Sequence, residues 1–552
     1  MIDTIEIKVG KEKLKVTKGV TLSEIAEKYE HLFKHPILLA KINNQFKDLN
    51  YQIMDDSEIE FLDLSSIEGN RVHVNGLIFL LVFAVKNLYG KKADVRIEHS
   101  LDKGIYIESN FRLNKVRVSE IKDKMKEISE KDLPISKVTI DRLDVIDYYE
   151  KIGDLEKVKT LKYNTNNYVN LYRLGNIYDY FYSIMPIYTN QLKEFDLTYI
   201  EDNGFILRFP TVYNSDSILP YSHHQKMFKV FGESREWAKI MRIQTSGDLN
   251  EVVSRGKIND IIKIDETLQS NRLLNLAKNI NEKRNRIKIV CFAGPSSSGK
   301  TTTTKKLSMY LESFGITPKV ISMDDYYLER EEAVKDENGE YDYECLEALD
   351  LKLFNKQISQ LLKGNTVDTP VYNFVLGKKE FTKTITMNKN DILLIEGIHA
   401  LDPKILTNIP RNNIIKVYIS PLTELNIDNH NRISTADNRL LRRMIRDART
   451  RGKGVEDSIK AWADVRDGEE KYIFPYQDEA DYTLNTAAIY ELGVLRTYVE
   501  PLLFDVDVDS PYYEDAKRLM RFISLFLPIP ADAIPEDAII REFIGESYFE
   551  NK

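Results

Sequence analysis

The sequence is poor in cysteine and has no long apolar run. Only two of its 552 residues are cysteines, Cys291 and Cys345, which excludes a disulfide framework and favours a reducing cytoplasm. The longest apolar run, Leu77–Val85, is far shorter than the ~20 residues that a membrane helix needs. The charged, alternating N-terminus is not a signal peptide. These absences predict a soluble cytoplasmic protein with no membrane partner.

The sequence also lacks an excess of charge of one sign. It carries 78 basic and 86 acidic residues, for a net charge of −8. This balance gives no global nucleic-acid footprint, although it leaves a local basic patch open. The length predicts roughly three or four domains.

What the sequence does have is a complete phosphate-binding loop. Gly294–Thr301 reads GPSSSGKT and fits the pattern G-x-x-x-x-G-K-[ST] at every specified position. A predicted strand, Ile287–Ala293, precedes it, and a predicted helix, Thr302–Phe314, follows. Loop N–H groups and a helix N-terminus favour an anionic phosphate. We therefore expect ATP or GTP to be bound by Gly294, Pro295, Ser296, Ser297, Ser298, Gly299, Lys300, Thr301 and Thr302, with Lys300 on the β- and γ-phosphates and the Thr301 hydroxyl on Mg²⁺.

Acidic residues follow further predicted strands. Lys319–Met323 leads into Asp324 and Asp325, and Asp391–Glu396 ends in a carboxylate. Carboxylates at the carboxyl ends of strands in an open α/β sheet lie where ligands bind, and one of them can sit beside Mg²⁺. With a fourth strand over Ile414–Ile419, the pattern predicts an α/β domain with a doubly wound parallel sheet.

A strongly basic helix is predicted after the fourth strand. Arg439, Arg442, Arg443 and Arg446 are spaced i, i+3, i+4 and i+7, so they share one face, and Arg451 extends the charge. Beside a phosphate-binding loop, such a face suits a lid that closes over a polyphosphate. The alternative is a solvated basic face.

Residues 1–64 form a separate predicted unit of strands and one helix. Thr21 and Glu24 fit a capping box, and a helix follows through Tyr29. This order describes a β-grasp fold and resembles the TGS domain of threonyl-tRNA synthetases, which implies a docking or regulatory module. The predicted strands are Thr4–Val9, Leu14–Thr17, Ile37–Ile42, Tyr51–Ile53 and Ser57–Leu62.

Residues 65–245 contain a mostly buried predicted helix, Gly76–Leu88, and a strand, turn and strand over Val95–Glu108. This region resembles the α+β editing domain of threonyl-tRNA synthetases, but the zinc-binding H-x-x-x-H pair of that family is missing. We therefore expect no active editing site, while RNA or tRNA contact through the two front domains stays open. The remaining histidines, which show no ligand spacing and are expected to be structural or on the surface, are His73, His99, His223 and His224.

Two further segments flank the loop-containing domain. Residues 246–286 have helical periodicity and are predicted to be a helical linker, and 486–552 a helical extension. In the extension, Leu492–Leu503 and Tyr512–Leu527 are expected either to pack on the preceding domain or to form a subunit contact, so homo-oligomerisation stays open.

Residues 287–485 resemble the uridine kinase and phosphoribulokinase family. The matching pieces are the loop, Ser322–Tyr327, Tyr341-Asp342, Pro370–Phe374, Ile395–Gly397 and Arg442–Asp447. The resemblance implies a kinase that transfers the ATP γ-phosphate to a nucleoside 5′-hydroxyl. It also implies these roles: Asp324 as general base, with Lys300, Arg443 and Arg446 as catalytic partners; Thr301, Glu396 and Asp324 around Mg²⁺; Arg451 on the triphosphate; and Asp324, Tyr327, Asp342 and Tyr372 on the acceptor.

The sequence departs from this family in one place. Tyr372-Asn373-Phe374 replaces the usual Tyr-Asp-Phe, and no base-contacting histidine follows. Selectivity for uridine or cytidine is therefore in doubt, and another small alcohol, or an RNA-linked regulatory role, stays open. A regulatory GTPase is the further alternative, because Asp336–Gly339 and Asn388–Asp391 fit D-x-x-G and N-K-x-D. Their contexts do not fit, since Asn388–Asp391 precedes a strand instead of following one.

Overall fold

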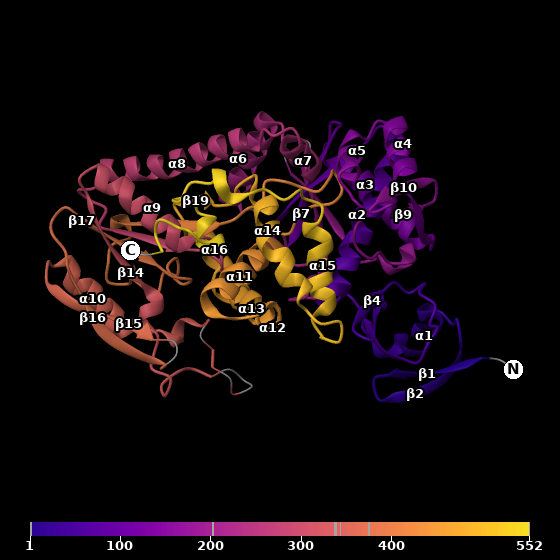
Figure 1. The fold of residues 1–552 in the computed structure, drawn as a ribbon, viewed down its shortest axis with the longest axis horizontal. Coiled ribbons are helices and arrows are strands. Elements are labelled where there is room, and N and C mark those ends of the chain that lie inside the picture. The colour runs from indigo at the N-terminus through magenta and orange to yellow at the C-terminus, as the bar shows by residue number, and fades with distance from the viewer. Residues whose placement is uncertain are drawn as a thin grey trace.

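A five-stranded parallel sheet lies at the centre of the C-terminal half of the computed structural model (Figure 1). Its strands, in spatial order, are β14 (Thr317–Ser322), β17 (Asp391–Glu396), β13 (Ile289–Ala293), β18 (Ile414–Ser420) and β19 (Tyr482–Asn485). All four neighbouring pairs are parallel, which confirms the predicted parallel sheet. β17 and β18 flank β13 on opposite sides. The order in which strands are added to the sheet therefore changes direction at β13, the strand that leads into the phosphate-binding loop.

Helices cover both faces of this sheet, because successive side chains of a strand point to opposite sides. Val290 and Phe292 pack against one layer of helices, while Cys291 and Ala293 face the other side. On the first side lie α8 (Ile258–Glu282) and α9 (Lys300–Ser313), and on the second α10 (Leu351–Leu362) and α6 (Gln225–Met241). The segment predicted to be a helical linker contains the short helix α7 (Ser246–Ser254) followed by α8. Helix α8 supplies core residues to the C-terminal half.

The chain ends in helices that form their own hydrophobic cluster with α11 (Thr435–Arg451). Apolar side chains of the segment Tyr512–Leu527, among them Leu519 and Phe522, are buried in this cluster, so this segment packs within the same chain. A two-stranded hairpin, β15 (Thr366–Asn373) and β16 (Lys378–Thr386), extends from the other end of the domain. The remaining helices here are α12 (Val455–Lys460), α13 (Trp462–Tyr472), α14 (Glu491–Phe504), α15 (Tyr513–Ile523) and α16 (Arg541–Ile544).

The N-terminal unit is a mixed five-stranded sheet with α1 (Leu22–Tyr29) packed on it. β1 and β5 pair in parallel at its centre, as the β-grasp arrangement expected from the sequence requires, and Thr21 and Glu24 form the predicted capping box. The TGS identity stays a prediction. In spatial order the strands are β2 (Glu12–Thr17), β1 (Thr4–Val9), β5 (Ser57–Leu62), β3 (Leu39–Ile42) and β4 (Gln45–Lys47).

One predicted strand of this unit was wrong. Tyr51–Ile53 does not join the sheet; its only bridge pairs Gln52 with Thr21. The segment lies along the start of α1, where the Leu22 N–H donates to the Tyr51 carbonyl oxygen at 3.0 Å. The strand missed by the sequence analysis is β4, which follows a tight turn at Asn43 and Asn44, both with positive φ.

The middle region surrounds a long apolar helix, α2 (Ile67–Tyr89). By length and composition it is apolar enough to cross a membrane, but 67% of its most apolar stretch is buried inside the protein, as in the core helix of a soluble domain. It packs against α3 (Lys115–Glu130) and an antiparallel sheet. That sheet contains, in order, β11 (Asp196–Tyr199), β12 (Gly204–Arg208), β7 (Gly104–Ser109) and β6 (Val95–Leu101).

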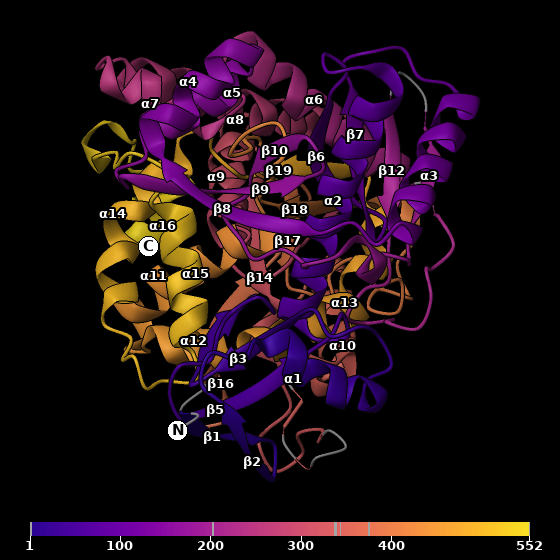
Figure 2. The ribbon, with the colours of Figure 1, turned by 90° about the vertical axis from the view of Figure 1, so that its right-hand side faces the viewer.

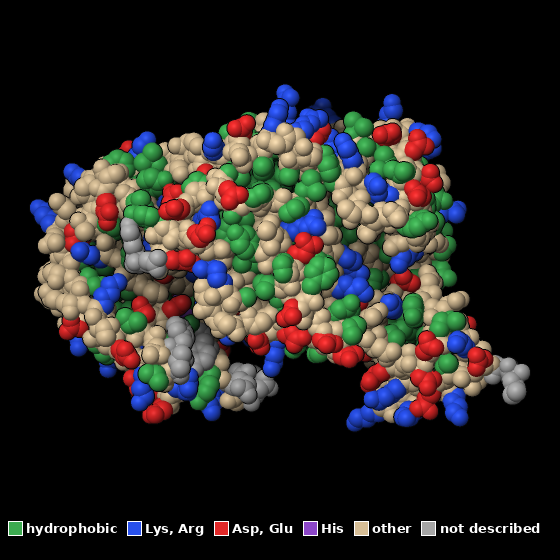
Figure 3. All heavy atoms as spheres, viewed as in Figure 1, with side chains coloured by type: hydrophobic (Ala, Val, Ile, Leu, Met, Phe, Trp, Pro, Cys, Tyr) green, Lys and Arg blue, Asp and Glu red, His purple; other side chains and the backbone are tan. Residues whose placement is uncertain are grey.

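A smaller layer completes the middle region (Figure 2). It pairs a three-stranded antiparallel sheet with two short helices. The elements are β8 (Ile135–Asp141), β9 (Tyr168–Leu174), β10 (Ile177–Tyr180), α4 (Arg142–Ile152) and α5 (Leu155–Lys162). The structure describes residues 3–200, 204–222, 224–335, 339, 341–342, 344–373 and 376–550. On the face shown in Figure 3, basic and acidic side chains are interspersed, in keeping with the near-balance of charge in the sequence.

Candidate active site

The phosphate-binding loop connects β13 to α9, as the motif predicts. One of its glycines is required by the lack of space for a side chain, and the other by its backbone conformation. A Cβ on Gly294 would lie 2.0 Å from the Ile419 carbonyl oxygen. Gly299 has φ of 82° and precedes the first residue of α9, a conformation that L side chains rarely adopt. The helix begins at Lys300, two residues earlier than predicted. The loop therefore turns sharply from the sheet onto a helix N-terminus, where an anion is favoured.

Buried side chains hold the loop from behind. Arg439 and Arg442 donate to the carbonyl oxygens of Ser296 and Ser297 at 3.2 and 3.3 Å, and the Thr486 hydroxyl donates to that of Ser298 at 2.6 Å. Arg439 and Arg442 are 2% and 0% exposed. The alternative of a solvated basic face is therefore wrong for these two arginines, which form buried ion pairs with Glu469 and Glu491.

Lys300, Thr301, Asp324 and Glu396 lie together at the carboxyl edge of the sheet. The Lys300 ammonium donates to the carbonyl oxygens of Gly294 and Pro295 at 2.9 and 3.1 Å. The Thr301 hydroxyl donates to the Glu396 carboxylate at 3.1 Å. Asp324 follows β14 and Glu396 ends β17, so parallel neighbouring strands bring the two carboxylates to one edge.

The carboxyl groups of this cluster resist ionisation. Burial and the nearby Asp324 raise the pKa of Glu396 to about 7, although Lys300 and the Thr301 hydrogen bond act in the opposite direction. Burial also raises the pKa of Asp324, against the lowering effect of Lys300 and Arg451. Burial lowers the pKa of Lys300, and the acids offset part of this effect. Two neighbouring acids in this state would be stabilised in their charged forms by an added cation.

The donor set fits Mg²⁺ bound together with a triphosphate. A hydroxyl and carboxylates are oxygen ligands, which Mg²⁺ prefers. Among the described residues, no group of three or more His, Cys, Asp or Glu side chains is placed to hold a metal ion by itself. Mg²⁺ commonly takes the rest of its ligands from water and substrate phosphates, so Thr301, Glu396 and Asp324 would be the protein's share of the ligands.

Three exposed or half-buried arginines of α11 converge on one buried carboxylate. Arg446 pairs with Asp447 at 2.8 Å, and Arg443 and Arg451 approach it at 3.4 Å each. Arg443 also donates to the Ser296 hydroxyl of the loop at 3.1 Å. Asp447 thus orients guanidinium groups beside the loop, where they can neutralise the charge of a bound polyphosphate.

The predicted acceptor residues lie next to this cluster. The rings of Tyr327 and Tyr372 meet edge to face, with centroids 5.7 Å apart. Burial raises the pKa of Tyr327, and the carboxylates of Asp324 and Asp342 add to this effect. Asp342 also accepts from the N–H groups of Glu344 and Cys345 at 2.9 and 3.2 Å. The structure therefore brings the four predicted acceptor residues together around Tyr327. Phe374 and Val375 lie outside the described residues.

Three carboxylates of the site were missed by the sequence analysis. Glu469 accepts from the Ser296 N–H at 3.0 Å, and Glu542 of α16 accepts from the Thr302 N–H at 3.2 Å. Burial, with Glu469 and Asp324 nearby, raises the pKa of Glu344 to about 7. No motif marks Glu469 or Glu542, because only the tertiary fold brings them to the loop. Glu344 could have been suspected from its place beside Asp342.

Structural positions also account for the other residues that the sequence singled out. His73 is fully buried in α2, and burial lowers its pKa to about 4. His99 stacks on Phe231 at 3.6 Å between ring centroids, and His224 lies between two aspartates; His223 lies outside the described residues. Asp391 begins β17 and accepts from the Asn388 N–H at 2.9 Å, so N-K-x-D lies at the opposite end of that strand from Glu396. The residues 336–338 of D-x-x-G lie outside the described residues.

Strand, glycine-rich loop and helix, with acids at the ends of neighbouring strands, define this half as a P-loop phosphate-binding domain. The model of the phosphoribulokinase and uridine kinase family matches residues 289–490, which therefore form a domain of that family. Uridine kinase of Macrococcus caseolyticus (strain JCSC5402) is 28% identical over 221 residues, 39% of this chain and 97% of that protein. Uridine kinase of Staphylococcus aureus (strain JH9) is 29% identical over 194 residues, 35% of this chain and 84% of that protein.

Two solved kinase structures are similar to part of this chain. A possible uridine kinase from Bacillus stearothermophilus has 22% identity and a TM-score of 0.27, covering 39% of this chain and 98% of its own. D-glycerate 3-kinase from Cryptococcus neoformans has 12% identity and a TM-score of 0.23, covering 48% of this chain and 89% of its own. The family match leaves out the residues before 289, so the resemblances of the front domains stay predictions.

Proposed function

We propose that the chain is an ATP-dependent kinase that transfers the γ-phosphate to the 5′-hydroxyl of a nucleoside. The family match over 289–490 and the uridine kinase relatives support a phosphotransferase. The observation that carries the proposal is the meeting of Lys300, Thr301, Asp324 and Glu396 at one edge of the sheet, beside the loop. Phosphoryl transfer to a hydroxyl requires positioning and charge neutralisation more than covalent chemistry by the protein.

Each residue of the cluster has a role in this proposal. Loop N–H groups and Lys300 hold the triphosphate, and Arg443, Arg446 and Arg451 neutralise its charge. Thr301, Glu396 and Asp324 would hold Mg²⁺, which supplies positive charge at the phosphates when bound. Asp324 accepts the proton of the attacking hydroxyl, and its raised pKa brings it nearer the range in which a general base works best.

The acceptor is expected to lie between the tyrosines and the acids. Tyr372 offers an aromatic ring for a base, and Asp342 a carboxylate for sugar hydroxyls. Asp325 accepts from the Tyr372 N–H at 3.2 Å and can position that residue. The missing histidine after Tyr372 leaves room for a second candidate, a kinase of another small alcohol. An RNA-linked regulatory role through the front domains is the third.

A product screen distinguishes these candidates. The full chain with Mg-ATP is offered a panel of nucleosides, sugars and small alcohols, and new phosphate esters are read by mass spectrometry. We expect a nucleoside monophosphate with the wild-type protein and none with Lys300→Ala. A product only from a non-nucleoside alcohol would favour the second candidate. ATP binding without any product would overturn the kinase proposal and favour the regulatory role.

A further inference from the structure

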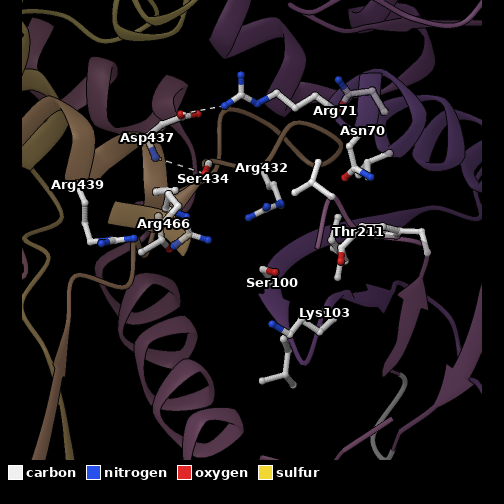
Figure 4. A pocket seen from close by; sticks show the side chains of 18 of the residues that line it. Asn70, Arg71, Ser100, Lys103, Thr211, Arg432, Ser434, Asp437, Arg439 and Arg466 are labelled. Atoms are coloured by element: carbon white, nitrogen blue, oxygen red, sulfur yellow. Dashed lines mark hydrogen bonds and ion pairs between the residues drawn. The ribbon is translucent and has the colours of Figure 1, made fainter. Parts of the chain in front are cut away.

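A cavity of about 470 Å³ lies between the middle region and the kinase domain and borders the phosphate-binding loop at Pro295 (Figure 4). Its walls come from α2, from the turn between β6 and β7, and from the segment that leads into α11. None of Lys300, Thr301, Asp324 and Glu396 lines it, nor do the acceptor residues. The side chains proposed to react or to hold the acceptor therefore lie outside this cavity.

One part of the cavity wall is apolar. Val74 and Ile78 of α2, Phe209, and Met227 and Phe231 of α6 line it. The volume lies within the range of roughly 300–1,000 Å³ that is usual for small-molecule sites. A ligand of this size with an aromatic or apolar body would fit against these side chains.

The polar part of the wall is rich in positive charge. Seven Lys and Arg residues line the cavity, against four Asp and Glu residues. Several of these cations are already paired: Arg466 with Glu469 at 2.8 Å, and Arg518 with both oxygens of Asp437 at 2.9 and 3.0 Å. Such pairs leave little charge for a ligand, so the cations without a carboxylate partner decide what the cavity binds.

Arg432 differs from these paired cations in having no carboxylate partner among the described residues. Among the described residues, its guanidinium forms no ion pair, and its one hydrogen bond is a 3.4 Å contact with the Ile433 carbonyl oxygen. Figure 4 shows it reaching into the hollow between Arg466 on one side and Asn70 and Thr211 on the other. Burial lowers its pKa, and Tyr182 and Asp437 offset only part of this effect. A guanidinium in this position is a ready partner for an anion.

A second feature favours an anion at the same place. The 17-residue helix α11 begins at the cavity, where Ser434, Thr435 and Ala436 line the wall. The N-terminus of a helix carries partial positive charge and backbone N–H donors. Arg432 and this helix end therefore act on one region of the cavity.

We propose that this cavity binds a phosphate monoester of a small, partly apolar molecule, with the phosphate on Arg432 and the body against α2 and α6. A phosphate monoester carries close to two negative charges at neutral pH and offers several acceptor oxygens, which suits a guanidinium fork better than a single carboxylate does. The phosphate position on Arg432 uses none of the side chains of the proposed phosphoryl transfer, so this proposal does not depend on the proposed function.

Binding of 1-naphthyl phosphate to the full-length protein tests this proposal. The fluorescence polarisation of the probe is titrated with wild-type protein, Arg432→Met and Arg432→Lys. Loss of the guanidinium is expected to weaken binding roughly tenfold or more, and the lysine to restore part of it. Equal affinity of wild type and Arg432→Met, or no binding by the wild type at millimolar concentrations, would overturn the proposal.

Three controls establish where the probe binds and which of its groups is recognised. Arg286→Met removes an exposed arginine outside the cavity and should bind the probe as the wild type does. Lys300→Ala should do the same, since loss of binding there would place the probe in the P-loop. Neutral 1-naphthol and singly charged 1-naphthoate should bind at least several-fold more weakly, and equal binding of either would contradict a phosphate site.

If Arg432→Met does not fold, Ser100→Trp at the cavity wall tests the same prediction by occlusion.

Discussion

The kinase half and the front half of the molecule both contain charged groups with shifted pKa values, but only the group in the kinase half is placed where a ligand can bind. In the kinase half, Lys300, Asp324 and Glu396 have shifted pKa values and gather at an open loop. At the junction with the front half, Lys157 and Asp179 are almost fully buried and pair at 2.9 Å. The first group stays available to a ligand, whereas the second is closed within the protein.

The junction group is a complete ionic network. His430, from the kinase half, contacts Asp179 at 2.6 Å and Asp94 at 3.1 Å, and Lys157 donates to Asn429 at 3.0 Å. Every charge there has a partner of opposite sign, which is how buried charges are tolerated. The comparison teaches that a shifted pKa alone does not mark a functional site; the shifted groups must also face a place where a ligand can bind.

The largest effect should come from the loop lysine. Lys300→Ala is expected to lower phosphoryl transfer at least about a thousandfold, because Lys300 is the one lysine of the loop and its charge is lost from the phosphates. The matched control is Lys363→Ala, an exposed lysine after α10, which should keep wild-type turnover. The rates are compared by product formation and the folds by thermal melting. Retained turnover in Lys300→Ala would mean that the loop does not bind the triphosphate.

Breaking a buried pair behind the loop should cost stability. Arg442 and Glu491 are 0% and 1% exposed at their side chains, so Arg442→Met leaves an unpaired buried carboxylate and should lower the free energy of unfolding by roughly 3–5 kcal/mol. Denaturant unfolding measures the change. Lys151→Met, which breaks an exposed pair with Asp147 in the front half, should cost about 0–1 kcal/mol. Similar losses for the two variants would contradict the contrast between buried and exposed pairs.

The junction network predicts a loss of stability in alkali. Burial alone would lower the pKa of His430, but Asp179 and Asp94 outweigh it and raise the pKa to about 9, from 6.5 in the unfolded chain. The stabilisation is therefore fully present below pH 6.5 and is lost as the pH rises through about 9, by an amount on the order of 3 kcal/mol. Unfolding free energies between pH 6 and 10 measure it. His430→Gln should flatten this dependence, whereas His31→Gln, an exposed histidine, should not.

The smallest effect is expected at Glu542. Its carboxylate accepts from the Thr302 N–H, at the helix end where a phosphate is expected. Glu542→Gln removes a negative charge from this place and should tighten ATP binding by about two- to fivefold, in keeping with the strength of such helix-end interactions. Calorimetric titration with Mg-ATP measures the change, and Glu550→Gln, farther along the same tail, is the control. Weaker binding in Glu542→Gln would show that the carboxylate supports the site instead.

The sequence predicted the elements whose signal is local. β1, β5 and β17 have the predicted bounds, since alternating or continuous apolar runs mark them directly. The loop and α9 follow from the motif and its flanks. The strand at Tyr51–Ile53 was wrong because a short run of mixed side chains can satisfy its backbone against a helix end as well as in a sheet. β4 was missed although Asn43 and Asn44 are typical of a tight hairpin turn.

What the sequence could not predict is the pairing of distant residues. Glu542 lies 240 positions from Thr302, and Lys157 lies 271 positions from Asp428, so no local pattern connects them. The arginine face of α11 shows the same limit. Spacing placed Arg439, Arg442, Arg443 and Arg446 on one face, but only the fold separates the two that brace the loop from the two that lie beside it.

The most direct test of the central claim compares turnover with nucleotide affinity in Asp324→Asn. If Asp324 is the general base of a working kinase, the variant should lose about 10²–10⁴-fold in turnover while its Kd for ATP changes by less than about threefold. Equal losses in turnover and in ATP affinity would mean that Asp324 serves the nucleotide or its metal ion. Unchanged turnover would contradict the assignment of the reacting site to this edge of the sheet.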